Sequence, residues 1–461
     1  MVIRVKILDY DVVIVGLGPA GSSLAYHLRD SGLRVAGIDL VDWSGIWGKP
    51  CGDAIGEHHF HENKMPLPIG DALANRVDGI DVYSPSEEVK LRVKGTGFMI
   101  NRNAYGTMIL KEAEKSGVDL YLETYVRGPR MEGSKLVGVR AVNNKGEELE
   151  FRGKVIVDAT GTSGVLRRRL PEEWPVNERL KPVDMNVAYR RIVRLASEIE
   201  DPNYIRIYVN MSIAPGGYWW LFPKSEHIAN IGLGVQGGRG YPHPKSIYDN
   251  VLMKRPDVGS QVEVYADAGA AVPTRRPANT LVWDNFIGIG DNGFTVNPVH
   301  GGGMGYAMNA AYHASKAIVE AFTQGDFTRY GPLWRTNLAY MKGIGAKQAS
   351  LDIFRIYLQE LTDEEIEWAL KNGIMRAEDA YETSVTGDLK ANLSILDKAR
   401  MLVRLLGRPS MLQQLVTVSR YMKKAKELYL NYPENPDDLG EWVSKVTKLY
   451  TEYKERIGVN W

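Results

Sequence analysis

The sequence contains a single cysteine, Cys51, among its 461 residues. No disulfide can form within one chain, and a reducing compartment is the simplest setting for such a protein. No apolar run reaches the roughly 18 residues that a membrane-spanning helix needs. Residues 1–11 lead straight into an apolar strand pattern and lack the features of a signal peptide. We therefore expect a cytoplasmic protein, with peripheral contact to a membrane surface left open.

The chain also lacks a surplus of charge of either sign. It has 57 Lys and Arg residues against 56 Asp and Glu residues, which gives a net charge of +1. A dedicated nucleic-acid-binding protein needs a basic surplus for its phosphate contacts, so we expect no nucleic-acid partner. There is no internal repeat, and the length is sufficient for two or three domains with a large core.

What the chain does contain is a dinucleotide-binding pattern near its N-terminus. A short apolar strand over 11–15 is followed by Gly16, Gly18 and Gly21 in G-x-G-x-x-G spacing, and a helix is predicted over 22–30. Gly16 permits a tight turn, Gly18 lets the backbone approach a pyrophosphate, and Gly21 lets the helix pack closely on the strand. The pattern predicts a pyrophosphate site at the helix N-terminus.

A second predicted strand, 33–38, ends in Asp39. This carboxylate is placed to accept hydrogen bonds from ribose hydroxyls. A glycine motif alone is also typical of an ordinary turn. The strand, helix, second strand and terminal acid together favour the dinucleotide site.

A glycine-rich loop over 43–60 follows this second strand and contains Cys51 between Pro50 and Gly52. Such a loop is typical of backbone held close to a large flat ligand. Two interpretations of Cys51 are open, a side chain that lines a site and a small buried hydrophobe. Asp53 is either an acid of the site or a turn former.

Three aromatic residues share one face of a strand later in the chain. Tyr218, Trp220 and Phe222 occupy alternate positions and therefore point the same way. One interpretation is the core of a β-sandwich. The other is an apolar wall for a long hydrophobic substrate.

The remaining pattern is mixed. A loop over 285–305 with three consecutive glycines leads into a helix predicted over 306–323. The backbone amides of this loop and of the helix N-terminus would face an anionic or carbonyl edge of a ligand.

Residues 173–200 are expected to be polar and irregular. The pair Arg275 and Arg276 is either a charged loop or an anion contact. Hairpin strands are expected over 80–93, sheet strands over 98–103, 118–126, 135–142 and 151–158, and helices over 105–116, 333–358, 363–372, 393–406, 410–429 and 438–457.

The motifs GLGPAG (16–21), PCGDAI (50–55), DATG (158–161), YWWLFPK with GLG (218–234) and GDNGFTVNPVHGGG (290–303) together resemble a known family. The chain is similar to archaeal geranylgeranyl reductases, in the flavoprotein superfamily typified by para-hydroxybenzoate hydroxylase. The resemblance covers essentially the whole chain. It implies an FAD-dependent reductase that saturates isolated C=C bonds of geranylgeranyl chains, above all in digeranylgeranylglycerophospholipids of archaeal membranes.

The implied fold class is α/β. A Rossmann-like FAD-binding domain (1–60, 99–165 and 283–330) would carry an inserted antiparallel β-sheet domain for the substrate (61–98 and 166–282). A helical C-terminal domain would follow (331–461). Lys423, Lys424 and Lys426 in that last part are expected to form a solvated face, with a membrane-surface patch as the alternative.

The resemblance also implies site residues. The FAD pyrophosphate would lie on Gly16, Gly18, Ala20 and Gly21, the adenosine ribose on Asp39, the adenine beside Val126, and a further part of the cofactor on Arg102. Cys51, Gly52 and Ala54 would lie along the flavin, Asp291 on the ribityl chain, and Gly303 and Met304 at the isoalloxazine edge. Tyr218, Trp220 and Phe222 would line the prenyl tunnel. The family usually has glutamate where this chain has Asp39, and the shorter acid can do the same work.

The proton donor for such a reaction is not evident from the motifs; Cys51 is the first candidate and an ordered water the second. No second dinucleotide motif is present, so the electron donor is open between NAD(P)H and ferredoxin. Three alternative functions remain: a flavin monooxygenase of the same superfamily, a prenyl-lipid-binding escort protein, and a reductase of the chlorophyll side chain.

Overall fold

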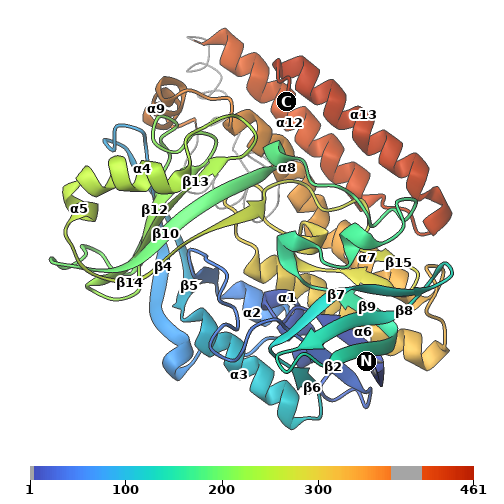
Figure 1. Ribbon diagram of the computed structural model, residues 1–461. Helices are drawn as coiled ribbons and strands as arrows, with labels where there is room; N and C mark the ends of the chain where they lie inside the picture. Colours follow the sequence, from blue (N-terminus) through green and yellow to red (C-terminus); the bar gives the residue numbers. More distant parts are fainter. Residues whose placement is uncertain (1–4, 375–407) are drawn as a thin grey trace.

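The computed structural model describes residues 5–374 and 408–461, and its strands form two eight-stranded sheets (Figure 1). The predicted helix over 393–406 lies outside the described residues. The α/β fold class is confirmed, and helices dominate the C-terminal part. How the chain divides into domains stays a prediction.

The first sheet carries the dinucleotide motif. Its central strand β1 (Lys6–Val15) pairs in parallel with β2 (Val35–Ile38) on one side and with β9 (Glu148–Asp158) on the other. The helix α1 (Pro19–Leu28) follows β1 directly. The sheet is completed by β6 (Asp119–Tyr121), β15 (Val282–Trp283), β16 (Phe286–Gly288) and the hairpin of β7 (Thr124–Glu132) with β8 (Lys135–Asn143).

The second sheet has the strand order β14-β10-β13-β12-β11-β4-β5-β3, and every neighbouring pair is antiparallel except β11 with β4. Its strands are β3 (Ala54–Gly56), β4 (Leu73–Tyr83), β5 (Lys90–Ile100), β10 (Met185–Leu195), β11 (Tyr204–Tyr208), β12 (Tyr218–Pro223), β13 (Ile228–Gln236) and β14 (Gln261–Pro273). The short helices α4 (Pro244–Asn250) and α5 (Pro256–Gly259) lie against its outer face (Figure 1).

Two predictions about this sheet and its neighbourhood are wrong. Residues 173–200 are not irregular throughout, because β10 is an eleven-residue strand between β13 and β14. Its arginines mask the alternation of apolar residues, and the pairing on both sides decides its conformation. Arg102 does not end a strand. Strand β5 stops at Ile100, and Arg102 is the first residue of α3 (Arg102–Lys115), whose N-cap Asn101 is extended.

The C-terminal helices pack on one another beside the two sheets, and α12 (Pro409–Leu430) and α13 (Leu439–Ile457) lie side by side in Figure 1. The single helix predicted over 333–358 is interrupted by a π-helical segment at Met341–Gly345, where Gly343 leaves the helical conformation. No helix in the described ranges is long and apolar enough to cross a membrane. The C-terminal part also contains α7 (Arg335–Tyr340), α8 (Ala346–Leu358) and α9 (Asp363–Lys371). Earlier in the chain lie α2 (His58–Glu62) and α6 (Met304–Gln324).

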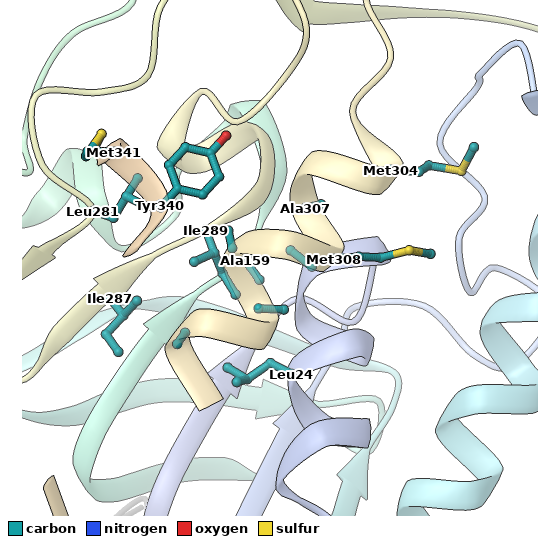
Figure 2. Packing of buried hydrophobic residues seen from close by; sticks show 14 of the residues in the cluster. Leu24, Ala159, Leu281, Ile287, Ile289, Met304, Ala307, Met308, Tyr340 and Met341 are labelled. Atoms are coloured by element: carbon teal, nitrogen blue, oxygen red, sulfur yellow. The ribbon is translucent and has the colours of Figure 1, made fainter. Parts of the chain in front are cut away.

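The largest core cluster extends from the first sheet through α1, α3 and α6 to the C-terminal helices, and one part of it lies where α1, α6 and the end of β9 meet. Figure 2 shows this part of the cluster, with Leu24 of α1, Ala159 just after β9, and Ala307 and Met308 of α6 among its labelled side chains. Small residues at this junction let helix and strand backbones approach closely. The same junction forms the floor of the site described below.

The two arginines after β14 are held inside the protein. Arg275 donates to Glu178 at 2.8 Å, and Arg276 lies 3.7 Å from the same carboxylate. Burial alone would raise the pKa of Glu178, but the attraction of Arg275 and Arg276 outweighs it and holds that pKa below its ordinary value. These contacts favour a structural role over an anion contact for the pair.

Candidate active site

A cavity of about 390 Å³ opens at the carboxyl ends of β1 and β2, beside the start of α1. This edge of a parallel sheet is where open α/β folds place their ligands. Ten of the residues predicted from the sequence line it: Gly16, Gly18, Ala20, Asp39, Cys51, Arg102, Val126, Asp291, Gly303 and Met304.

The glycines of the motif have the separate roles that their spacing predicts. Gly16 has φ +90°, and a Cβ there would lie 2.6 Å from the Ala159 carbonyl oxygen. Gly21 does not line the cavity; a Cβ there would lie 1.8 Å from the Gly16 oxygen, so it serves helix packing. A Cβ on Gly18 would meet no atom within 4 Å, which leaves space over the backbone where α1 begins.

The N-terminus of α1 is open toward the cavity. The helix begins at Pro19, and its N-cap Gly18 offers no side chain to cap the first amides. Unpaired helix N–H groups and the helix dipole both favour an anion at this position. The arrangement therefore fits a pyrophosphate.

Asp39 holds the glycine loop as well as lining the cavity. One carboxylate oxygen accepts from the Leu17 amide at 2.5 Å, and the other accepts from the Val41 amide at 3.2 Å. Each carboxylate oxygen has more than one lone pair, so these bonds leave room for a ribose hydroxyl. Thr124 at the start of β7 donates its amide to the Asp39 carbonyl and brings Val126 to the same side.

The glycine-rich loop is fastened by the first turn of α3. Arg102 donates its Nε to the Trp47 carbonyl at 3.0 Å, and Asn103 donates to the carbonyls of Trp43, Ser44 and Ile46. These bonds depend on the helix starting at Arg102 rather than later. They fix the loop that carries Cys51.

One charged residue of the cavity was not predicted from the sequence. Lys49 lies two residues before Cys51, and its Nζ is 2.5 Å from the carboxylate of Asp291. The two residues are 242 positions apart in the chain, so no local pattern links them. The pair joins the glycine-rich loop to the turn before α6 at the cavity wall.

Gly52 and Ala54 do not line the cavity but lead from it to the second sheet. A Cβ on Gly52 would lie 2.8 Å from the Phe222 ring, so this loop passes directly over the aromatic strand. Ala54 belongs to β3 at the end of the second sheet and packs beside Trp220 and Phe222. The loop 50–56 therefore joins the cavity to the aromatic face.

The predicted sharing of one face by the aromatic residues is confirmed. Tyr218, Trp220 and Phe222 belong to one apolar cluster. Trp219 points to the opposite face and stacks on Tyr208, with the ring centroids 3.6 Å apart. Tyr218 donates its hydroxyl to the His300 carbonyl at 2.6 Å, and burial raises its pKa.

A buried polar network connects this face to Cys51. Asn230 of β13 donates to the Cys51 carbonyl at 2.7 Å and to Asp53 at 3.0 Å, and it accepts from the Trp220 indole at 3.0 Å. Asp53 is also paired with the Lys224 ammonium at 3.2 Å. Asp53 is thus part of a structural network rather than a simple turn, although its backbone has φ +67°.

The sequence also matches models of known families. The model described as "FAD dependent oxidoreductase" matches residues 11–169, and the one described as "Geranylgeranyl reductase catalytic domain" matches residues 184–272. The first match contains the glycine motif and most of the cavity lining, and the second contains β10, β12, β13 and most of β14. The open α1 N-terminus, the space over Gly18 and the carboxylate of Asp39 fit the FAD that the first model names.

If this cavity holds FAD, a side chain on Gly18 should displace it. We expect Gly18→Val to fold, because the new side chain meets no protein atom at its Cβ, and to lose bound flavin. Gly95→Val is the matched control, since Gly95 also has open space but lies on β5 outside the cavity. The flavin released on denaturation measures the result. Equal flavin in Gly18→Val and Gly95→Val would contradict the assignment.

Among solved structures, a geranylgeranyl bacteriochlorophyll reductase-like protein of Thermoplasma acidophilum covers 90% of this chain and 100% of its own, with TM-score 0.75 and 21% identity. A flavin-dependent brominase matches with TM-score 0.62 and 20% identity, covering 82% of this chain and 99% of its own. At these identities the likeness shows the fold alone.

Similarity to curated relatives is higher than to these solved structures. A digeranylgeranylglycerophospholipid reductase of Sulfolobus acidocaldarius is 46% identical over 454 residues, 98% of this chain and 100% of the relative. A protein of the same name from Methanosarcina acetivorans is 29% identical over 69% of this chain and 77% of its own. Full-length similarity at this level, together with the fitted cofactor site, leads to one conclusion: the chain belongs to the digeranylgeranylglycerophospholipid reductase family of FAD-dependent oxidoreductases.

Proposed function

We propose that this protein saturates isolated C=C bonds of geranylgeranyl chains, with digeranylgeranylglycerophospholipids as its substrates. The observation that carries this proposal is the contact between the loop that lines the cavity and the aromatic cluster of β12. The loop with Cys51 lines the cofactor cavity, and the next residue of that loop passes over the aromatic cluster of β12. A hydrophobic chain against the cluster would therefore lie near the cofactor.

An isolated alkene has no carbonyl group that an acid could polarise. Its reduction needs a hydride at one carbon and a proton at the other, in a site without competing water. FAD in its reduced, bound form supplies the hydride. The chain's own contribution is to hold the prenyl segment in a dry apolar setting and to present a proton to the other carbon of the double bond.

Trp220 and Phe222 suit the first task, because both are at least nine-tenths buried and lie on the cluster beside Gly52. Their ring faces would also stabilise positive charge that develops at the tertiary carbon. The three aromatic residues are therefore proposed to line the prenyl site. The ten cavity residues named above are proposed to hold FAD, with Gly21, Gly52 and Ala54 supporting them from behind.

For the second task we propose the Cys51 thiol as proton donor. Cys51 lines the cavity, and its backbone carbonyl accepts a hydrogen bond from Asn230. The sulfur would give its proton to the less substituted carbon and regain one from solvent after turnover. NAD(P)H or ferredoxin is the proposed electron donor. Peripheral membrane contact would give access to the lipid, although Lys423 and Lys424 make local contacts with Glu427 and Tyr421 that suit a solvated face.

The reaction is tested with anaerobic enzyme reduced by dithionite and supplied with a digeranylgeranyl glycerophospholipid in detergent. We expect the lipid to gain two hydrogen atoms for each double bond reduced, measured by mass spectrometry. Oxidised enzyme is the control. Lipid recovered at its starting mass, or oxygen-dependent hydroxylation of an aromatic acid instead, would contradict the proposal and favour the monooxygenase alternative.

The proton donor is tested by Cys51→Ser. A thiol has a pKa near roughly 8.5 and a serine hydroxyl is a far weaker acid, so prenyl reduction should slow by about a hundredfold or more. The flavin content and the rate of flavin reduction by dithionite serve as internal controls and should match wild type. An unchanged rate of chain saturation would eliminate Cys51 as the donor and leave the reductase proposal standing.

A further inference from the structure

Arg190 of β10 lies on the same face of the second sheet as the aromatic cluster. Its neighbours along the strand show this: Tyr189 and Arg191 point to the other face, where they bond to Asp267 and Asp249. Successive strand residues alternate between faces, so Arg190 faces the side of Trp220.

The strand register brings Arg190 next to the aromatic wall. Arg190 pairs with Gly232 on β13, and Gly232 pairs with Trp220 on β12. A Cβ on Gly232 would lie 2.5 Å from the Trp220 ring and 2.7 Å from the Cβ of Arg190. The indole therefore lies over Gly232 and reaches toward the arginine.

Two of the three guanidinium nitrogens of Arg190, Nε and Nη1, are buried without a hydrogen-bond partner in the described part of the chain. Among the described residues no carboxylate forms an ion pair with Arg190, in contrast to Arg191, which lies 2.7 Å from Asp249. The side chain as a whole is half-buried, so its remaining nitrogen is not enclosed. Two buried donors without a partner favour an anion at this position.

The position of Arg190 relative to the cavity suits a long substrate. Val272 of β14 lines the cavity and pairs with Asn186, whereas Arg190 pairs with Ala268, four residues further along both strands. Four residues of a strand span about 13 Å. On this face of β14, Ala268 lies opposite Arg190 and Ala270 is the one residue between Ala268 and Val272, so little side-chain bulk separates the arginine from the cavity end.

We propose that Arg190 binds the phosphate group of the lipid substrate and so fixes the depth to which the prenyl chain enters the site. This inference rests on the proposed function. A planar guanidinium offers paired N–H donors that match two phosphate oxygens. A free geranylgeranyl alcohol has no such group, so the enzyme should distinguish phosphorylated from unphosphorylated substrates through this one residue.

The test compares wild type with Arg190→Met in phosphate-free buffer, with dithionite as the reductant in place of NAD(P)H, so that neither buffer nor reductant brings a competing phosphate group. Each protein receives a digeranylgeranyl glycerophospholipid or geranylgeraniol. We expect the ratio of kcat/KM for lipid over alcohol to fall by about tenfold to about a hundredfold in Arg190→Met, mainly through KM for the lipid. Arg194→Met is the matched control, because Arg194 is an exposed arginine on the same strand, and its ratio should equal that of wild type.

Several outcomes would overturn the inference. The ratio for Arg190→Met could equal that of wild type, or Arg194→Met could lower it as much. Inorganic phosphate forms a third arm: if Arg190→Met loses the inhibition of alcohol reduction by phosphate but keeps the wild-type lipid-to-alcohol ratio, the arginine binds free phosphate and not the lipid. Flavin content shows whether Arg190→Met has folded, and Arg190→Lys, which keeps the charge, should restore part of the ratio. If wild type reduces neither substrate, the proposed function fails, which is distinguishable from failure of the arginine's role.

Discussion

The side-chain amide of Asn230 is the contact on which the site depends. It is completely buried, and it bonds at once to the Cys51 carbonyl, the Asp53 carboxylate and the Trp220 indole. A buried amide that lost one of these partners would leave a donor or acceptor unsatisfied, at a cost of about 1–3 kcal/mol. The three partners are therefore held in one arrangement, and the loop over the cofactor cavity cannot move independently of the aromatic strand.

The charges around Asn230 strengthen this arrangement. Asp53 and Lys224 are both buried, and Lys224 also donates to the Ile100 carbonyl at 2.8 Å. Removing one partner of a buried pair leaves the other charge uncompensated, so neither can be replaced alone without loss of stability. The network thus ties strands β5 and β13 of the second sheet to the loop that begins in the first sheet.

Much of the cofactor side could be predicted from the sequence because its determinants are local. The turn at Gly16, the open space at Gly18 and the acid after β2 lie within one strand–helix–strand unit, whose spacing sets their geometry. The alternation that places Tyr218, Trp220 and Phe222 on one face is equally local. The pairs Lys49–Asp291 and Asp53–Lys224 could not be predicted from the sequence, because each joins segments that only the tertiary fold brings together.

The same limit explains β10 and Arg190. The arginines of this strand break the apolar alternation, so the sequence alone suggests an irregular segment. Only the pairing with β13 and β14 shows that Arg190 lies on the face of the aromatic cluster and Arg191 on the opposite face. The role proposed for Arg190 therefore depends on the register of β10, which the sequence alone does not show.

The most direct test of the central claim is the effect of Asn230→Asp on two quantities measured together, flavin content and the rate of prenyl reduction. The aspartate keeps an oxygen for the Trp220 indole and loses the N–H donors to Cys51 and Asp53. The account predicts flavin content close to wild type and a reduction rate lower by about tenfold or more. Flavin and rate falling in parallel, or a rate equal to wild type, would contradict the claim that this amide joins the cofactor cavity to the prenyl site.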